Sequence, residues 1–441
     1  MELIDKILQK CADAGADLVD VFSISSQNLS ISVRNGQVES LKKATPGGMA
    51  IRFYKAGKMA FAHTTDLSEQ AIDGMIPKLA TLSQQTEADP LVNLPEPQKY
   101  VSDLDIFDQN RYALPTEAKI QYLKELESLA LKFDPLIDKS NGVTCDEWIT
   151  VKTLGNSKGV RVSYQSSFYR VAVSIIATKN GEMYPGEGAF HATHFDSIPH
   201  IAKIAERFAS RAVRLVGGRP VDGGDYEIIF TPRAANSIVY GLLAALNGDD
   251  AFKGASFLAD KLGQKIAVDN FTVYDDALMP RGVGSRPADD EGTASMRNTL
   301  IENGVVKGFM YDMKTAAKAK AKSTGSSMRE DYSSFPEIRA SNFFIAPGKD
   351  KVDDVIASCK RGIIVEETAG WGLQGVSGQY SAGINGILVE NGKKIRPVAG
   401  VTIAASADDI LNGLGAICDD ITYFDNINSP TLMVKRMTVG S

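Results

Sequence analysis

The stretch LSISVRNGQVESL, residues 29–41, decides the fold class of this chain. Strand-like residues flank Asn35-Gly36, and this dipeptide favours a two-residue hairpin because type I′ turns need positive φ at both central positions. Residues 47–65, GGMAIRFYKAGKMAFAHTT, predict a second hairpin that turns at Lys55-Ala56-Gly57. Antiparallel strands are therefore expected in this part of the chain.

Helical patterns surround these hairpins. Apolar residues of 2–15 form one helical stripe, and a second helix is expected to begin near Ser68, its N-cap. Residues 87–103 contain three prolines and no periodicity, which indicates a linker. The order then recurs as a helix at about 116–132, strands at about 143–153 and 159–179, an Asn180-Gly181 turn and a helix at about 198–215.

The second half of the chain is rich in short strands. YEIIFT is predicted to be a strand, and AANSIVYGLLAALNGDD, residues 234–250, is predicted to be a buried helix because it is almost entirely apolar. Residues 300–309 and 387–398 are two similar Glu-Asn-Gly hairpins. We expect an α+β protein: an N-terminal domain, 1–220, of helices on an antiparallel sheet, and a sheet-rich, mostly antiparallel C-terminal domain, 221–441.

Composition excludes several classes of function. The net charge of −6 argues against direct nucleic-acid binding, which needs basic surface. No apolar run approaches the roughly 20 residues that span a bilayer, and the first residues do not resemble a signal peptide. The four cysteines lie far apart and form no CxxC pair, which favours reduced thiols in the cytoplasm. The lack of a long apolar run leads us to expect no membrane partner.

Three of the four histidines lie in HATHFDSIPH, residues 191–200, which raises the question of a metal site. His191 and His194 point to opposite faces if the segment is a strand. His200 falls in the first turn of the next helix, which Asp196 or Ser197 can cap. Surface and strand-end histidines are therefore the favoured interpretation.

Charged clusters are the next candidates. Asp289, Asp290 and Glu291 could hold a hard cation, but solvated turn charges are favoured because calcium-loop spacing is missing. The lysines of KTAAKAKAK, at 314, 318 and 322, would share one helix face. They could grip a peptide carboxylate or phosphate, or simply be solvated.

Two glycine-containing loops offer further candidates. STGSSMRED, residues 323–331, lacks both the phosphate-loop and the nucleophile-elbow pattern. GWGLQGVSGQYSAGINGIL, residues 370–388, lacks the dinucleotide-binding pattern. Its small residues instead suggest that another backbone approaches closely along a sheet edge.

Several ordered motifs carry a resemblance to a known family. They are DDEGTASMRNTLIENGVVKGFMYD (289–312), STGSSMRE (323–330), IRASNFFIAPG (338–348), residues 377–411 and the closing SPTLMVKRMTVGS. From about residue 225 to the end the chain resembles the TldD/PmbA family, also called modulators of DNA gyrase. The family implies a zinc-dependent peptidase built as a heterodimer. Its TldD subunit carries HExxxH on a helix and a later Cys ligand, and its TldE (PmbA) subunit has the same fold without them.

This chain departs from the zinc-bearing pattern. Val239 and Ala244 stand where the resemblance places the two His, and Tyr240 stands at the position of the Glu. The Cys ligand is expected within 422–428, TYFDNIN, which contains no cysteine, and Cys418 precedes that window. The resemblance therefore implies no catalytic residue and no metal in this chain, with zinc in the partner subunit.

We expect a TldE/PmbA-type subunit that pairs with a TldD-like zinc-bearing paralogue, or with itself when alone, and helps to bind an unfolded peptide as an added strand. The expected substrate-facing residues are Thr324, Arg329, Gln379, Ser381 and Gly383. Two alternatives stay open. One is a non-enzymatic binding protein that modulates DNA gyrase or a toxin–antitoxin system. The other is a stand-alone hydrolase that uses the Asp289–Glu291 cluster.

Overall fold

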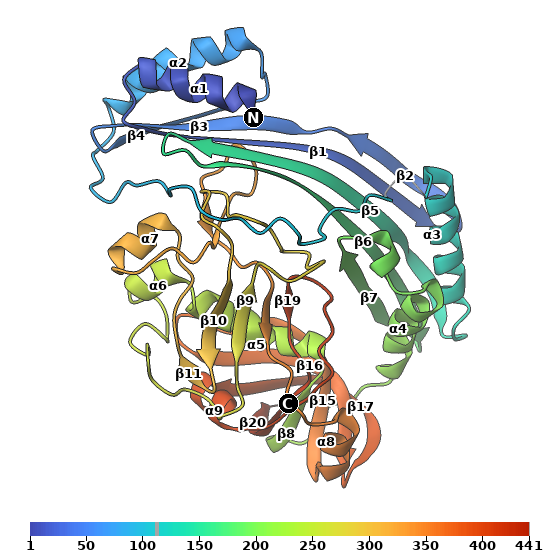
Figure 1. Ribbon diagram of the computed structural model, residues 1–441. Helices are drawn as coiled ribbons and strands as arrows, with labels where there is room; N and C mark the ends of the chain where they lie inside the picture. Colours follow the sequence, from blue (N-terminus) through green and yellow to red (C-terminus); the bar gives the residue numbers. More distant parts are fainter. Residues whose placement is uncertain (111–113, 441) are drawn as a thin grey trace.

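A computed structural model describes residues 1–110 and 114–440 of the chain, and its mixture of helices and antiparallel sheets confirms the α+β prediction. The N-terminal half builds a seven-stranded sheet in the order β4-β3-β1-β5-β6-β7, with β2 beside β1. Its strands are β1 (Leu18–Arg34), β2 (Gln37–Ala44), β3 (Gly47–Lys55), β4 (Lys58–Thr64), β5 (Ile137–Asn156), β6 (Arg161–Lys179) and β7 (Glu182–Ala192). Figure 1 shows that this sheet arches over the C-terminal half.

The predicted two-residue hairpin turns are confirmed. Asn35 and Gly36 join β1 to β2 with φ of 52° and 71°, and Asn180 and Gly181 join β6 to β7 with φ of 53° and 84°. Positive φ at both central positions matches the right-handed twist of the flanking strands, which is why Asn-Gly marks these turns.

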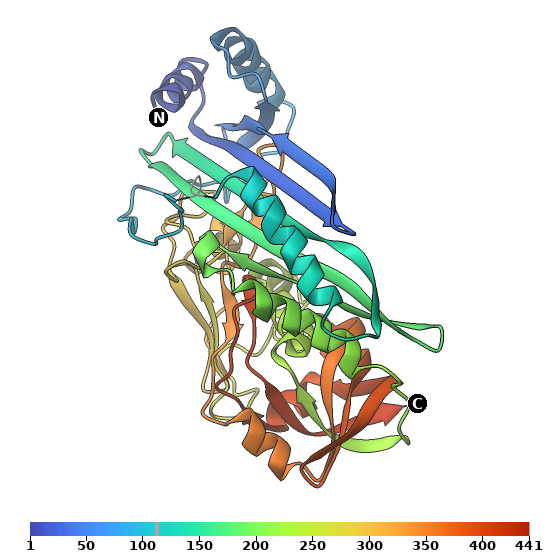
Figure 2. The ribbon, with the colours of Figure 1, turned by 90° about the vertical axis from the view of Figure 1, so that its right-hand side faces the viewer.

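Helices cover one face of the arch. They are α1 (Glu2–Asp13), α2 (Glu69–Ser83), α3 (Thr116–Leu131) and α4 (Ile201–Arg214). The odd-numbered β1 residues Val21 and Ile31 are buried beneath helices α1–α2 and α3–α4 respectively. Figure 2 shows α3 and α4 side by side across the strands. Phe22 points to the opposite face and packs against Ala288 of the C-terminal half.

The start of α4 differs from the prediction. The expected caps, Asp196 and Ser197, lie instead in the short 3₁₀ turn η1 (Phe195–Ser197). The N-cap is His200, whose Nδ1 accepts the N–H of Ala202 at 3.3 Å. The cap prediction was wrong because the turn moves the first helical residue to Ile201.

Residues 87–103 contain neither helix nor strand and lie between α2 and α3 in the chain, where the sequence predicts a linker. The Tyr100 hydroxyl donates to the carbonyl of Gly292 at 3.0 Å, and the Asn156 amide donates to the carbonyl of Pro95 at 2.8 Å. The linker therefore fastens to both halves of the molecule.

The C-terminal half combines a six-stranded and a five-stranded sheet. The first follows the order β17-β16-β15-β8-β20-β18 and the second β11-β10-β9-β14-β19. The elements are β8 (Gly224–Phe230), α5 (Pro232–Ala245), α6 (Gly248–Phe252), β9 (Val273–Asp276), β10 (Arg297–Glu302), β11 (Val305–Val306), α7 (Met313–Lys318), β12 (Ser327–Met328), β13 (Glu337–Ile338), β14 (Phe343–Ile345), α8 (Val352–Ser358), β15 (Arg361–Leu373), β16 (Gln379–Glu390), β17 (Lys393–Ser406), α9 (Ala407–Asn412), β18 (Leu414–Ile417), β19 (Ile427–Asn428) and β20 (Leu432–Gly440).

The larger C-terminal sheet curls so that β17 also pairs with β20. As a result β16 lies between two partners: Gly383 pairs with Ala369 of β15 and with Thr402 of β17. The interpretation of residues 370–388 as a free sheet edge was therefore wrong. The small residues permit close packing inside the chain, since a Cβ at Gly386 would lie 2.1 Å from the Ile364 carbonyl oxygen.

Helix α5 forms the centre of the C-terminal core. Ile238 and Leu242 are fully buried in one cluster that also holds Ile228 of the larger sheet and Phe343 of the smaller one. The prediction of a buried helix holds for this side only, because Tyr240 is 54% exposed. No helix in residues 1–110 and 114–440 is both long enough and apolar enough to cross a membrane.

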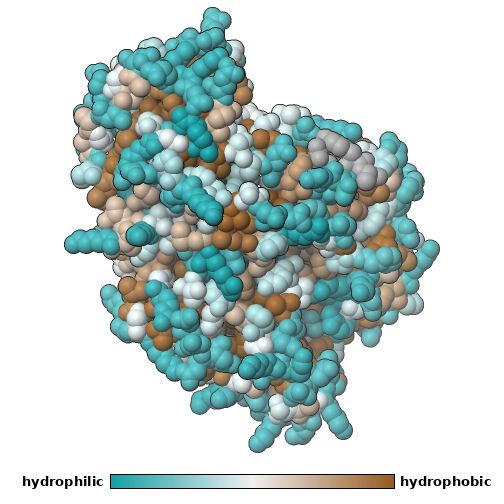
Figure 3. All heavy atoms as spheres, viewed as in Figure 1, coloured by the Kyte–Doolittle hydropathy of each residue, from teal (hydrophilic) through white to brown (hydrophobic). Residues whose placement is uncertain are grey.

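The molecular surface seen in Figure 3 is hydrophilic over most of its area, with apolar patches between the polar side chains. This mixed surface is ordinary for folded proteins, in which apolar atoms still supply much of the accessible area. Surface hydropathy therefore marks no functional site on this face of the molecule.

Candidate functional site

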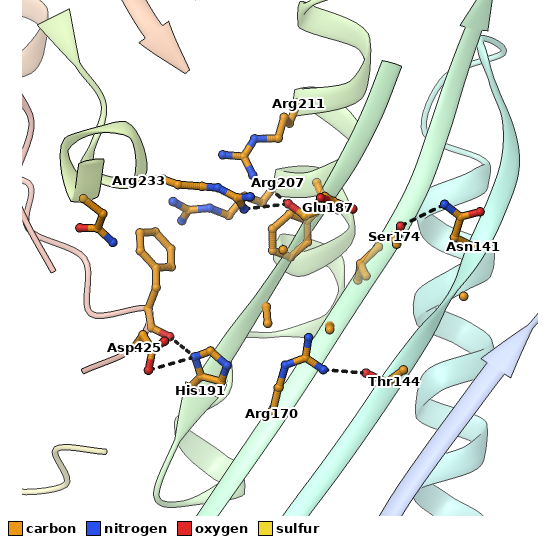
Figure 4. Close-up of a pocket in the computed structure, with 18 of the residues that line it drawn as sticks. Asn141, Thr144, Arg170, Ser174, Glu187, His191, Arg207, Arg211, Arg233 and Asp425 are labelled. Carbon is orange, nitrogen blue, oxygen red and sulfur yellow. Dashed lines mark hydrogen bonds and ion pairs between the residues drawn. The ribbon is translucent and has the colours of Figure 1, made fainter. Parts of the chain in front are cut away.

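A cavity of about 520 Å³ lies where the arch meets the C-terminal half, and we call it the cleft. Its walls come from β5, β6 and β7, from α4, from α5, and from the loop that carries Phe424 and Asp425. Figure 4 shows charged side chains from these elements pointing toward one another. The cleft thus joins segments more than 200 residues apart in the chain.

One wall is the exposed side of α5. Thr231 is the N-cap and Pro232 occupies the first turn, where its fixed φ suits a helix. Arg233, Asn236 and Tyr240 follow at helical spacing and line the cleft, while the opposite side of the helix enters the core.

The loop opposite α5 is held by its own side chains. The Asn428 side-chain oxygen accepts the N–H of Phe424 at 2.9 Å, which fixes the turn. Burial, and then the nearby charge of Asp425, raise the pKa of the Tyr240 hydroxyl. Tyr240 therefore keeps its proton at neutral pH and presents a hydrogen-bond donor beside a carboxylate.

Three guanidinium groups meet at one end of the cleft, and we call Arg207, Arg211 and Arg233 the arginine trio. Arg207 and Arg211 lie one turn apart on α4, so they share a helix face. Arg211 and Arg233 both donate to the main-chain carbonyl of Glu187 on β7, at 2.8 and 2.9 Å.

The trio is electrostatically unfavourable by itself. Burial, followed by the charge of Arg233, lowers the pKa of Arg211 to about 10, although Glu367 lies 3.4 Å away. Burial and the charge of Arg214 also lower the pKa of Arg207. The Arg207 guanidinium stacks 4.2 Å from the centre of the Phe424 ring. These groups remain cationic at neutral pH but repel one another.

The other end of the cleft is polar and partly neutralised. Arg170 donates to Thr144 at 3.2 Å and to Asp146 at 3.1 Å. The His191 Nδ1 atom lies 2.7 Å from the Phe424 carbonyl oxygen, and its ring stacks on Phe168 at 5.3 Å. His191 thus bridges β7 and the loop that carries Phe424 and Asp425.

The other two clustered histidines have separate partners. His194 is buried, with Nε2 3.3 Å from Asp105, and His200 caps α4. The three imidazole rings of residues 191–200 therefore do not converge on one site.

The residues at the positions implied for zinc do not fit that metal. Val239 is fully buried in the core, Tyr240 faces the cleft, and Ala244 has no ligand atom in its side chain. Cys418 lies in the cluster on the other side of the larger sheet, where burial raises the pKa of its thiol to about 12. A zinc ligand set needs thiolate, imidazole or carboxylate groups that converge. Within the described residues, no three His, Cys, Asp or Glu side chains meet in a way that could hold a metal ion.

The carboxylates of 289–291 differ from the prediction of solvated turn charges, because all three are buried. Both oxygens of Asp290 accept from Lys152 at 2.9 Å, and Glu291 pairs with Arg52 at 3.3 Å. Asp289 accepts the N–H groups of Thr293 and Ser327 at 2.8 and 3.2 Å. This cluster fastens the C-terminal half to the sheet and does not line the cleft.

The lysine helix was also predicted wrongly, because α7 ends at Lys318 and Lys320 adopts a positive φ of 53°. Lys322 therefore does not share a helix face with Lys314 and Lys318. Lys314 is paired with Asp89 at 2.6 Å, and Lys318 with Asp249 at 3.1 Å. These lysines are already neutralised by the chain itself.

The residues expected to face a substrate do not come together in the cleft. Thr324 exchanges hydrogen bonds with the main chain of Tyr311 at 2.7 and 3.0 Å. Arg329 is buried with its Nη2 atom 3.4 Å from Asp20. Gln379, Ser381 and Gly383 lie on the outward side of β16, with Gly383 partly covered. Their contact with a peptide stays a prediction.

Sequence reasoning missed the arginine trio. One signal was present, since Arg207 and Arg211 stand four apart on a strongly amphipathic helix. The third member, Arg233, begins a different helix, and only the folded arch brings it to the other two.

Comparison with known proteins covers nearly the whole chain. Family models of PmbA/TldA metallopeptidases match residues 19–79 (domain 1), 111–216 (central domain) and 223–441 (C-terminal domain). Metalloprotease PmbA homolog of Haemophilus influenzae is 27% identical over 97% of this chain and 93% of its own length. Metalloprotease PmbA of Escherichia coli O157:H7 is 26% identical with the same coverage. The crystal structure of TldE from Thermococcus kodakarensis superposes with a TM-score of 0.89 at 22% identity over the whole of both chains, which shows a shared fold.

Proposed function

The chain belongs to the PmbA/TldA metallopeptidase family, and we propose that it is the zinc-free, PmbA-type subunit of a two-subunit peptidase. The catalytic zinc belongs to a TldD-like paralogue. This chain binds no metal of its own and contributes a peptide-binding cleft. Its substrates are unfolded peptides.

One observation carries this proposal: the two segments implied to hold zinc in the family meet at the cleft and supply one carboxylate, that of Asp425, but no histidine or cysteine. Tyr240 of α5 and the Phe424–Asp425 loop line the same cavity. The polar side chains that α5 places there are those of Arg233, Asn236 and Tyr240. Such groups bind and orient polar ligands, whereas a hydrolytic zinc site needs an activated water.

The free edge of the arch supports peptide binding. In the part of the chain that the structure describes, β7 ends the strand order of its sheet. The Asn180-Gly181 hairpin makes Lys179 and Glu182 a hydrogen-bonded pair, so the main-chain groups of Glu187, Ala189 and His191 point away from β6. An extended peptide can pair with this open edge, and main-chain pairing gives affinity with little sequence preference.

Exposed apolar side chains support the proposed pairing with a paralogue. In the β15–β16 hairpin, which packs on α5, Trp371 is 85% exposed and Val376 is 67% exposed. Large apolar groups that stand in water at a hairpin tip are characteristic of protein–protein contact surfaces. The same surface can pair with a second copy of this chain when the paralogue is missing.

The proposed compartment is the cytoplasm. The four cysteines are all buried and unpaired, and burial raises the pKa of the Cys11 and Cys145 thiols to about 12. Unreactive, unpaired thiols suit a reducing environment.

The test is digestion of an unfolded, labelled polypeptide by three samples: this chain, a zinc-motif paralogue, and their mixture. We expect cleavage by the mixture and none by this chain alone. Full cleavage by the paralogue alone, unchanged when this chain is added, would contradict the subunit role. Cleavage by this chain alone would favour the stand-alone hydrolase.

A further inference from the structure

The arginine trio forms a wall between two adjoining cavities. Arg207, Arg211 and Arg233 line the cleft of about 520 Å³ and also a second cavity of about 640 Å³. The charged residues that the second cavity adds are Lys203, Arg214, Glu206 and Glu366. Two cavities thus give access to the same three guanidinium groups.

Carboxylates of residues 1–110 and 114–440 pair with only one of the three arginines. Among the described residues, the ion pair of the trio is the one between Arg211 and Glu367, at 3.4 Å, and Glu366 pairs with Arg214 at 3.1 Å. Arg207 stacks on aromatic rings, and Arg233 donates to a main-chain carbonyl. Burial, followed by repulsion from neighbouring arginines, lowers the pKa values of Arg207 and Arg211, so the positive charge of the trio is only partly compensated.

The start of α5 adds to the positive potential. Arg233 stands in the first turn of this helix, where the unpaired N–H groups carry partial positive charge. Thr231 does not cap those groups with its side chain, because its hydroxyl donates to the carbonyl of Val365 at 2.9 Å. An arginine at this end is unfavourable unless an anion joins it.

The open edge of β7 indicates which kind of ligand carries that anionic group. The Glu187 carbonyl already accepts from Arg211 and Arg233, so a strand added along Ala189 and His191 must stop there. A strand that runs antiparallel to β7 reaches this point with its carboxyl end. Its last group then lies among three guanidiniums, whose planar donors match a carboxylate.

We propose that the arginine trio binds the C-terminal carboxylate of an extended peptide whose main chain pairs with β7. This proposal rests on the proposed peptide-binding function and assigns its site. In this proposal, this chain is the subunit that recognises the carboxyl end of a substrate. Lys314 and Lys318, each paired with an aspartate, are not available for this task.

The test measures binding to this chain alone by fluorescence anisotropy. The probes are a labelled octapeptide of Gly, Ala and Ser with a free carboxylate, its C-terminal amide, and an amide that carries one internal Glu. We expect the free acid to bind roughly tenfold more tightly than either amide, the scale of one charge-assisted contact. We expect Arg207→Gln and Arg233→Gln each to remove most of that preference.

The matched control is Arg436→Gln, which removes the same charge from an exposed residue that pairs with Asp225 on β8. It should keep the preference. Thermal denaturation verifies that each variant is folded, and Arg233 is exposed, so its loss should leave the fold intact. Equal binding of acid and amide, or a preference that survives in both trio variants, would overturn the proposal. If the amide with the internal Glu bound as tightly as the free acid, the trio would not be specific for a C-terminal carboxylate, and that part of the proposal would be overturned.

The outcomes separate this inference from the proposed function. A carboxylate preference without cleavage in any mixture would uphold the site and refute the peptidase-subunit role. Cleavage in the mixture, together with equal binding of acid and amide, would uphold the subunit role and refute the site.

Discussion

At the scale of the residue, the junction of the two halves is held by buried charges, among them the carboxylates of Asp20, Asp289, Asp290 and Glu291. Arg52 contacts Asp20 at 2.5 Å and Glu291 at 3.3 Å, and all three side chains are nearly inaccessible. Removing one partner of such a cluster leaves another charge buried without a counter-charge, which costs about 3–5 kcal/mol in comparable buried pairs. These contacts fix the arch over the C-terminal half and thereby shape the cleft.

Asp289 makes the stability of the protein depend on pH. Burial, followed by the charge of Glu291, raises its pKa from 3.8 to about 7. Between these values the folded state binds a proton that the unfolded state has lost, so the free energy of unfolding falls as pH rises from about 4 to about 7. Asp289→Asn should flatten this part of the curve, by up to about 1.4 kcal/mol per pH unit. Chemical denaturation at a series of pH values measures it.

Asp66→Asn is the control for this prediction. Hydrogen bonds from Ser68 lower the pKa of Asp66, so it titrates below the window. Its replacement should leave the slope between pH 4 and 7 unchanged. An Asp289→Asn protein with the wild-type slope would contradict the assignment.

The sequence of residues 288–292 could not reveal this burial. The pattern is that of a polar turn, and its partners Arg52 and Lys152 lie 239 and 138 residues away from Glu291 and Asp290. Solvation of a charge is decided by the tertiary fold, and local composition carries no information about it.

At the scale of the element, the strand β7 is where peptide addition can be tested. Ala189→Pro removes an N–H that points away from β6, so the sheet itself loses no ladder hydrogen bond. We expect peptide affinity to fall roughly tenfold and the melting temperature to change little, as anisotropy and thermal denaturation would record.

His63→Pro provides the comparison. His63 lies on β4, the opposite edge strand of the same sheet, and its main-chain N–H points away from the neighbouring strand β3. This variant should bind peptide as the wild type does. If both proline variants lose affinity equally, the peptide does not pair with β7.

The β15–β16 hairpin is the second element with a testable role. Trp371→Asp places a charge at the most exposed large apolar side chain of the described residues, and it should weaken the proposed pairing with a paralogue at least tenfold. Light scattering with the purified subunits measures the mass of the complex. Leu82→Asp, which changes a half-exposed residue on α2, should pair normally. A full-size complex with Trp371→Asp would place the interface elsewhere.

Elements could be predicted where the signal is local. Four hairpins turn at Asn-Gly pairs, each with both residues at positive φ, and the sequence alone identified them. The elements that failed depend on distant partners. The lysine helix ends at Lys318, after which the chain folds back and Thr324 bonds Tyr311. Residues 379–388 have no free edge because β16 pairs with both β15 and β17.

At the scale of the whole molecule, the arch and the C-terminal half make the cleft together. His191 and Phe424 are 233 positions apart, yet they are in hydrogen-bond contact across it. The family resemblance predicted that α5 and residues 422–428 belong to one site, but the arginines of α4 enter only through the curvature of the sheet. The sequence therefore predicts only those walls of the cleft that the C-terminal half of the chain supplies.

The most direct measurement is the rate of digestion of an unfolded peptide by the zinc-bearing paralogue mixed with wild-type chain, with Ala189→Pro or with Arg233→Gln. If this chain supplies the peptide-binding cleft, each variant should lower kcat/KM roughly tenfold while the assembled complex keeps its mass and zinc content. Arg436→Gln should support the wild-type rate. Equal rates with all four forms would contradict the central claim and leave this chain without a part in binding the substrate.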